Sequence, residues 1–151
     1  MNANRLISAV SVLGAVMVLL SACTPFTKVG GDNKTLGKLG GSWVVRHVAG
    51  KDLAGVRPEL TFDTSKGTIT GFDGCNRING TFAFEGDRLK AKTASTRMAC
   101  PNDPAHEASA AIHDLLNNGA EVVEVAMGQG RVLLMRNASA EIKMWPSANA
   151  K

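Results

Sequence analysis

The sequence predicts an α+β fold in which a curved antiparallel sheet forms a partial (cracked) β-barrel wrapped on one α-helix. Two observations predict it. Short segments that alternate or are rich in β-branched residues, separated by turn residues, fill most of residues 39–146, and only one segment there has helical periodicity. A single amphipathic helix needs a sheet to cover its apolar stripe, and a curved sheet wrapped on the helix is the simplest arrangement.

Five strands are expected before the helix. In the last two, apolar and polar side chains alternate, and Gly86-Asp87 between them indicates a hairpin turn. Asp73-Gly74 is a second turn dipeptide. The expected strands cover residues 42–49, 59–63, 67–72, 81–85 and 88–93.

One helix is expected after this hairpin. Asp103 is the predicted N-cap, and Pro104 occupies the first helical position, which favours proline. Gly119 is the predicted residue beyond its end. Its apolar side chains have the spacing of a single stripe: Ala108, Ala111, Ile112, Leu115 and Leu116. Three more strands are expected after it, at residues 120–127, 131–136 and 141–145.

The first 22 residues predict a lipoprotein signal peptide. Arg5 gives a positive start, and the uncharged apolar run of residues 6–20 is shorter than the roughly 20 residues of a membrane-spanning helix. The run ends in Leu20-Ser21-Ala22-Cys23, which resembles the lipobox of bacterial lipoproteins, with Cys23 as the lipidated residue. A simple secretory signal followed by a chance cysteine is the alternative. Thr24, in place of Asp, favours the outer membrane by the same resemblance.

Four regions follow from this. They are the signal peptide (1–22), a lipidated flexible tether (23–38), one folded domain (39–146) and a tail (147–151). We therefore expect a monomer in the bacterial envelope, anchored by lipid and facing the periplasm. The formal net charge of +4 becomes +3 without Arg5 of the signal peptide, and this mild basicity suits a surface near anionic lipid or another polyanion. The charges are too scattered to predict a nucleic-acid partner.

Two cysteines remain, Cys75 and Cys100. An exported domain meets oxidising conditions, so the pair predicts one disulfide. Closing a loop of this length stabilises the fold by roughly 3–4 kcal/mol in the chain-entropy model. Two free buried thiols are the alternative.

Two segments resemble the META domain of HslJ-like heat-shock lipoproteins. Residues 71–80 read Gly-Phe-Asp-Gly-Cys-Asn-Arg-Ile-Asn-Gly, and residues 95–101 read Ser-Thr-Arg-Met-Ala-Cys-Pro. That family has a G-x-x-G-C-N-x-x-x-G turn and then a T-[RK]-M-A-C-P loop before a helix. The resemblance covers about residues 39–146; Phe82 stands where a tyrosine is common. It implies a half-open barrel that cradles a helix, as in pilotin lipoproteins, and an envelope role linked to heat or antibiotic stress. It implies no known reaction.

A disulfide between these segments would gather a candidate binding patch beside it: Asn76, Arg77, Thr96, Arg97 and Met98. Two guanidiniums with polar neighbours suit a carboxylate or a phosphate. A structural explanation is the alternative. In it, Asn76 bonds its own turn, Arg97 lies along the surface or pairs with Glu107, and Met98 fills the core.

The sequence shows no catalytic or metal-binding pattern, so we expect no enzymatic activity, no metal and no cofactor. His47 lies in a predicted strand and indicates a core or edge histidine. His106 and His113 are about 10.5 Å apart along the helix axis, too far to share one metal, and are expected to be solvated. Asp73 and the other acidic residues near turns are also expected to be solvated.

Three functions remain open. The first is a non-enzymatic, stress-linked binding or accessory module that acts on an envelope protein or a small molecule. The second is a pilotin-like assembly factor whose open barrel holds a lipid tail or a partner's apolar segment. The third is a hydrolase inhibitor that presents a rigid loop.

Overall fold

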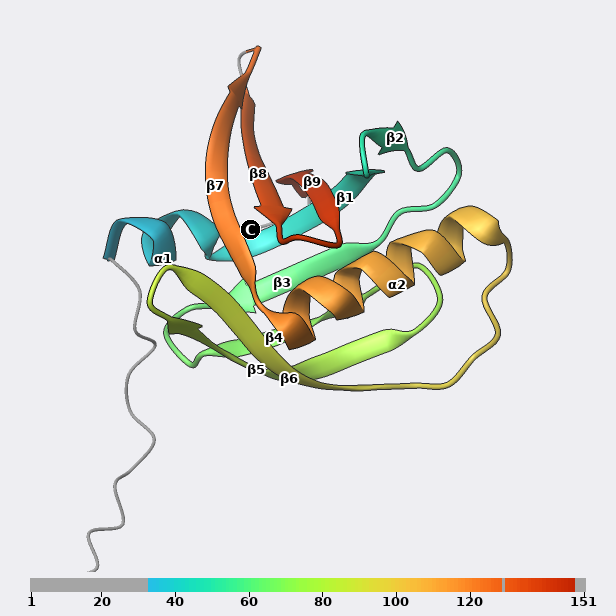
Figure 1. The fold of residues 1–151 in the computed structure, drawn as a ribbon, viewed down its shortest axis with the longest axis horizontal. Helices are drawn as coiled ribbons and strands as arrows, with labels where there is room; N and C mark the ends of the chain where they lie inside the picture. The colour runs from blue at the N-terminus through green and yellow to red at the C-terminus, as the bar shows by residue number, and fades with distance from the viewer. Residues whose placement is uncertain (1–32, 129, 149–151) are drawn as a thin grey trace, which may run out of the picture.

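The computed structural model describes residues 33–128 and 130–148 (Figure 1). The predicted signal peptide, Cys23 and the first part of the predicted tether lie outside the described residues. Neither helix in the described part is long and apolar enough to cross a membrane. The elements are α1 (Asn33–Leu39), β1 (Gly41–Val48), β2 (Lys51–Asp52), β3 (Glu59–Asp63), β4 (Thr68–Phe72), β5 (Arg77–Glu85), β6 (Arg88–Ser95), α2 (Asp103–Asn118), β7 (Ala120–Met127), β8 (Gly130–Arg136) and β9 (Glu141–Pro146).

The strands of the described residues form a closed antiparallel barrel. Each strand from β3 to β9 pairs with the next one along the chain, and β1 pairs with β3 on one side and with β9 on the other. The short β2 lies beside the end of β1 and stands outside this ring. The α+β class is therefore confirmed, but the expected partial barrel is wrong. Pairing between the first and last strands, with Val44 opposite Trp145, closes the sheet.

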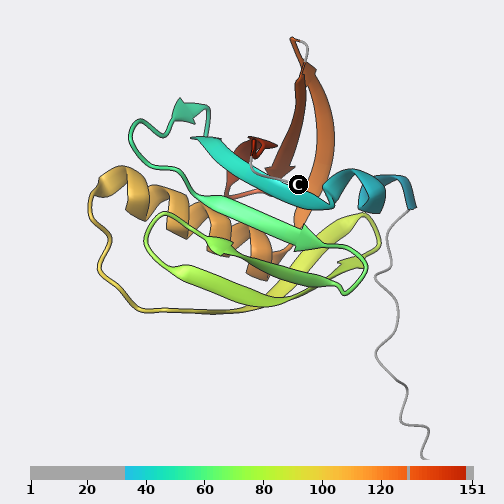
Figure 2. The same cartoon turned by 180° about the vertical axis from the view of Figure 1, so that it is seen from behind.

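The shortest strand pairing in the ring is the one between β6 and β7. Only two residue pairs join these strands, Arg88 with Glu121 and Leu89 with Ala120. Helix α2, which connects β6 to β7 along the chain, lies beside the part of these strands that is not paired (Figures 1 and 2). It contacts β6, β9 and β1. The helix thus covers the gap that a ring of paired strands alone would leave.

The core fills the barrel. The predicted stripe of α2 is buried, joined by Ala105, and packs against side chains from the inner face of the sheet. Phe62 and Phe82 meet there edge to face, with ring centroids 5.5 Å apart. Burying one large aliphatic side chain stabilises a fold by about 1.5–3 kcal/mol. Side chains less than 2 % exposed include Leu60, Ile69, Leu89, Ile112, Leu115, Leu116, Leu133, Met135, Ile142 and Met144.

The start of α2 differs from the prediction by one residue. Asn102, and not Asp103, is the N-cap: its backbone is extended and its side-chain oxygen accepts a hydrogen bond from the Ala105 backbone N–H at 3.0 Å. Asn and Asp cap helices about equally well, so two adjacent candidates could not be ranked from the sequence. Gly119 ends the helix at φ 87°, as predicted.

The folded part begins earlier than predicted. The sequence places residues 33–38 in a flexible tether, but they form helix α1 at one end of the barrel. Leu39 is fully buried, and its carbonyl accepts a hydrogen bond from Trp43 Nε1 at 2.7 Å. Lys38 lies 2.6 Å from Glu124, and its carbonyl accepts from Arg131 at 2.9 Å. A helix this short is marginal alone, so these tertiary contacts account for it.

Candidate functional site

Two loops meet at the end of the barrel opposite α1 (Figures 1 and 2). One joins β4 to β5, and the other joins β6 to α2. The predicted disulfide between them is present: Cys75 and Cys100 have an S–S distance of 2.04 Å and a Cα–Cα distance of 4.7 Å. Gly74, at φ 106°, lets the first loop approach α2, because a Cβ there would come within 3.2 Å of the Ala105 carbonyl oxygen.

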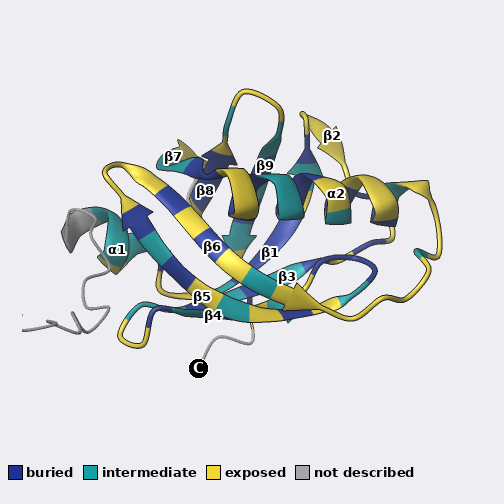
Figure 3. Ribbon diagram, turned by 60° about the horizontal axis from the view of Figure 1, so that its bottom comes forward, coloured by how far each residue is buried: buried dark blue, intermediate teal, exposed yellow. Residues whose placement is uncertain are grey.

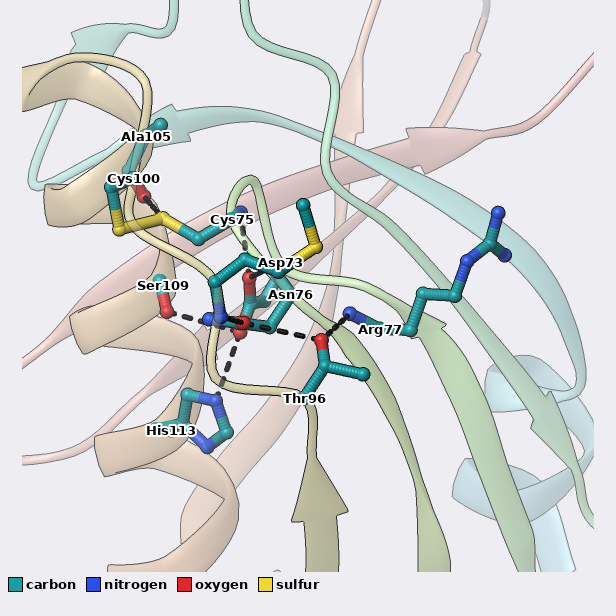
Figure 4. A network of polar contacts seen from close by, with 10 residues as sticks. Asp73, Cys75, Asn76, Arg77, Thr96, Cys100, Ala105, Ser109 and His113 are labelled. Carbon is teal, nitrogen blue, oxygen red and sulfur yellow. Dashed lines mark hydrogen bonds and ion pairs between the residues drawn. A yellow bond between two sulfur atoms is a disulfide. The ribbon is translucent and has the colours of Figure 1, made fainter.

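Asp73 ties the first loop to α2 (Figure 4). One carboxylate oxygen accepts hydrogen bonds from the backbone N–H groups of Cys75 at 2.8 Å and Asn76 at 2.6 Å. The other accepts from Ser109 Oγ at 3.0 Å and lies 2.9 Å from His113 Nε2. Asp73 is 0 % exposed. A buried carboxylate requires such partners, because an unpaired buried charge is very unfavourable.

The expectation that Asp73 and His113 are solvated is therefore wrong. The His113 side chain is only 27 % exposed and turns toward the loop rather than toward solvent. One signal was available in the sequence. Ser109 and His113 are four residues apart, so they lie on the same side of the helix, where both can reach one acceptor.

Asn76 ties the second loop to the first. Its side-chain oxygen accepts a hydrogen bond from the Met98 backbone N–H at 2.7 Å and one from Thr96 Oγ1 at 3.2 Å. The Thr96 hydroxyl oxygen accepts from the Arg77 backbone N–H at 3.1 Å, and the Thr96 N–H donates to the Arg77 carbonyl at 3.1 Å. The structure thus brings the five predicted patch residues together. Asn76 holds the neighbouring loop, whereas the structural explanation had it bonding its own turn.

The outer side of this patch faces solvent. Met98 is 68 % exposed, which rules out its predicted alternative role as core filler. Arg77 and Arg97 are exposed, and the Arg77 side chain points away from the Asp73 network (Figure 4). Loop residues 96–99 form a continuous exposed stretch (Figure 3). Sequence reasoning missed Phe72, which pairs with Arg77 across the strands and is 39 % exposed.

The carboxyl groups with clearly lowered pKa lie at the other end of the barrel. Hydrogen bonds from the Ser65 side chain and the Lys66 backbone lower the pKa of Asp63 to about 2. A hydrogen bond from Lys38 lowers the pKa of Glu124, and Arg131 adds to the effect. Both groups stabilise local contacts around α1 and the β3–β4 turn rather than the two loops.

Several surface cavities are lined by described residues. One of about 350 Å³ lies between β1 and the segment that leads to β3, and its lining includes Arg46, Asp52 and Arg57. Another of about 580 Å³ lies between α2 and the turns beside it, and its lining includes Lys51, Glu107 and Glu141. Both are open to solvent. The barrel interior is occupied by the side chains of the core.

Comparisons with known proteins agree with this architecture. The family model of the META domain matches residues 34–149. A protein from Burkholderia xenovorans, solved by NMR, is 24 % identical with a TM-score of 0.57, over 77 % of this chain and 88 % of that one. A second NMR structure is 28 % identical with a TM-score of 0.56, over 71 % of this chain and 89 % of that one. A search of curated proteins gave no match. The first likeness shows the shared fold alone.

Proposed function

Because the chain belongs to the META domain family, we propose that it is a lipid-anchored, stress-linked binding module of the bacterial envelope. In this proposal Cys23 carries the lipid at the outer membrane, and the domain faces the periplasm. The patch of Asn76, Arg77, Thr96 and Arg97, with Met98, binds an anionic group without catalysing a reaction. The observation that carries the proposal is the fixed, exposed position of the patch.

Three separate links support a rigid patch. The disulfide joins the loops covalently, Asp73 fixes the first loop on α2, and Asn76 holds the backbone of the second loop. A surface that is already ordered loses less conformational entropy when it binds, so more of the contact energy appears as affinity. Guanidiniums match the planar geometry of carboxylates and phosphates, which favours an anionic ligand.

The filled barrel favours a surface role over the pilotin-like alternative. A lipid tail or an apolar segment held inside the barrel would need the volume that the core side chains occupy. A loop tied down by a disulfide also suits an inhibitor of a hydrolase, because such loops bind enzyme clefts with little loss of entropy. Assays of envelope hydrolases with and without the protein distinguish an inhibitor from a binding module.

The anchoring is tested by labelling. Cells that express the full chain are grown with radiolabelled palmitate and then fractionated. We expect label on the protein and recovery with outer membranes, and we expect both to be lost in Cys23→Ala. Unlabelled protein in the soluble periplasmic fraction would contradict lipid anchoring.

The binding is tested by NMR on a chain that starts at residue 24, which keeps every described residue. Titration with inorganic phosphate and with succinate should give saturable shifts of the Arg77, Thr96, Arg97 and Met98 amides. Arg77→Gln/Arg97→Gln should abolish these shifts. Lys92→Gln, which removes a positive charge from β6 outside the patch, should not. Absence of saturable shifts with both anions argues against the patch. Turnover of an ester or envelope polymer that is lost in the double variant would show an enzyme instead.

A further inference from the structure

Four arginines lie at the same end of the barrel as the patch. Neighbouring strands run antiparallel, so the ends of β1, β4 and β6 share one rim of the barrel with the beginnings of β3 and β5. Arg46 is near the end of β1, Arg57 precedes β3, Arg77 begins β5 and Arg97 follows β6. These four residues, called the arginine rim below, are far apart in the sequence, and only the barrel brings them together.

The charges of the arginine rim are not neutralised by ion pairs. All four arginines are exposed, and none pairs with a carboxylate of the described residues. Continuing the register of β1 and β3 from Val44 opposite Glu59 places Arg46 opposite Arg57, and both line the same cavity of about 350 Å³. Three acids lie at these strand ends: Asp52 in that cavity, the half-buried Glu59, and the buried Asp73, whose carboxylate contacts its own loop, Ser109 and His113. The rim therefore keeps a positive charge.

Apolar side chains lie between these charges. Phe72, between Glu59 and Arg77 in the sheet, is exposed, and so is Met98 beside Arg97. At the other end of the rim, the Arg46 guanidinium lies 5.5 Å from the ring centre of the half-buried Trp145. Phe72 and Met98 are two of the three large apolar side chains exposed among the described residues. Such a surface offers both ion pairing and apolar contact.

We infer that the arginine rim is one extended docking surface for an acidic polypeptide segment that carries apolar side chains. This inference rests on the proposed function and deepens it, since it names the partner class and enlarges the site from the two loops to the ends of five neighbouring strands. Carboxylates of the segment would pair with Arg46, Arg57, Arg77 and Arg97. Its apolar side chains would contact Phe72 and Met98.

The position of the arginine rim favours a polypeptide over the membrane surface. The arginine rim lies at the opposite end of the barrel from α1, where the chain enters the domain (Figure 1). Under the proposed lipidation of Cys23, the attachment point precedes α1 in the chain and the rim lies at the other end of the described domain.

Fluorescence anisotropy with a labelled peptide tests the inference. The probe is three repeats of Glu-Glu-Phe-Ser, compared with three repeats of Gln-Gln-Phe-Ser and of Glu-Glu-Ser-Ser. The protein is the chain from residue 24. We expect the first probe to bind best. Each of Arg46→Gln, Arg57→Gln, Arg77→Gln and Arg97→Gln should raise its Kd about two- to fivefold, the range expected for one exposed ion pair. Lys92→Gln on β6 is the matched control and should leave Kd nearly unchanged. Salt should weaken binding.

The outcomes separate this inference from the proposed function. If only Arg77→Gln and Arg97→Gln weaken binding, the extended surface is overturned and the smaller patch stands. If the fourfold variant, folded by circular dichroism, binds like the parent, both are overturned. Stronger binding to phosphatidylglycerol vesicles than to the peptide would make a membrane the occupant and overturn the inference. Equal binding of the Glu-Glu-Ser-Ser probe would remove the role of Phe72 and Met98.

Discussion

The Asp73 side chain stabilises both the β4–β5 turn and the contact of that turn with α2. It accepts two backbone hydrogen bonds from its own loop and contacts Ser109 and His113 on α2. Because solvent does not reach it, water cannot replace any of these partners. The carboxylate therefore sets where Cys75 and Asn76 lie, and through them the position of the exposed patch.

Replacing this side chain should destabilise the whole domain. Asp73→Ala leaves the Cys75 and Asn76 N–H groups and His113 without their acceptor, so we expect a loss of about 3 kcal/mol in the free energy of unfolding. Urea denaturation followed by circular dichroism measures it. Asp87→Ala, at an exposed position in the β5–β6 turn, is the control and should change stability by about 0.5 kcal/mol at most. Equal effects of the two substitutions would mean that the Asp73 network contributes little.

The role of Asp73 could not be read from the chain because its partners are distant. An Asp-Gly pair is typical of exposed turns, and Ser109 and His113 follow 36 and 40 residues later. Met98 shows the same limit. An apolar residue close to a cysteine in the sequence suggests the core, but Asn76 binds the Met98 backbone and the Met98 side chain is exposed. The gathering of the five patch residues, in contrast, followed from one expected disulfide.

Among the structural elements, the disulfide links the β4–β5 loop to the β6–α2 loop. Cys75→Ser and Cys100→Ser should each lower the free energy of unfolding by about 3–4 kcal/mol, because each removes the same loop-closing bond. The double variant should lose no more than either single one. Denaturant unfolding of all three variants checks this. Additive losses would show that the two cysteines contribute separately rather than through their bond.

The β3–β4 turn should respond to pH. The Asp63 carboxylate accepts hydrogen bonds from Ser65 and Lys66, which lower its pKa to about 2, below the roughly 3.9 of an unfolded chain. The contribution of Asp63 to the free energy of unfolding is therefore full above about pH 4 and is lost as the pH falls toward 2. Asp63→Asn should melt at a lower temperature than the parent at pH 7, and the difference should shrink toward pH 2. A difference in melting temperature that does not change with pH would contradict this assignment.

Local patterns predicted most elements well. The alternation in β6 and the apolar stripe of α2 each show which side of the element is buried, and the predicted bounds of these two elements were close to the observed ones. The strand predicted at residues 81–85 was too short, because β5 begins at Arg77. The two elements that were missed have no such pattern. β2 has two residues, and α1 contains Gly37 in a polar stretch. Contacts of α1 with β1, β7 and β8 stabilise it, and no local window contains them.

For the whole molecule, α1 is part of the folded domain. A chain that starts at Leu39 lacks the Lys38–Glu124 ion pair, the Arg131 contact with the Lys38 carbonyl and the packing of Leu36 on the core. We expect it to melt several degrees below a chain that starts at Asn33, since about 1 kcal/mol shifts the melting temperature of a domain this size by roughly 4 °C. Calorimetry measures the difference. Equal melting temperatures would mean that residues 33–38 do not stabilise the domain and belong to the tether, as the sequence predicted.

Closure of the barrel depends on the pairing of segments that no sequence window contains together. Each strand could be predicted from its own residues, but whether β9 meets β1 depends on the summed twist and curvature of all the strands between them. The expectation of a partial barrel was wrong for this reason. Both edges of β1 are hydrogen-bonded to neighbouring strands in the closed ring. Between β6 and β7, beside α2, the pairing is limited to two residue pairs.

The pairing of β1 with β9 also determines when the barrel can finish folding relative to synthesis of the chain. Val44 and Trp145 are neighbours in the sheet but lie roughly a hundred residues apart along the chain. Contacts of such long range make folding slow, because a large loop must close before they form. The ring cannot be completed until the last strand has been synthesised, and a chain that stops before β9 keeps two unpaired strand edges. Complete folding of the domain therefore requires β9, which is the last strand to be synthesised.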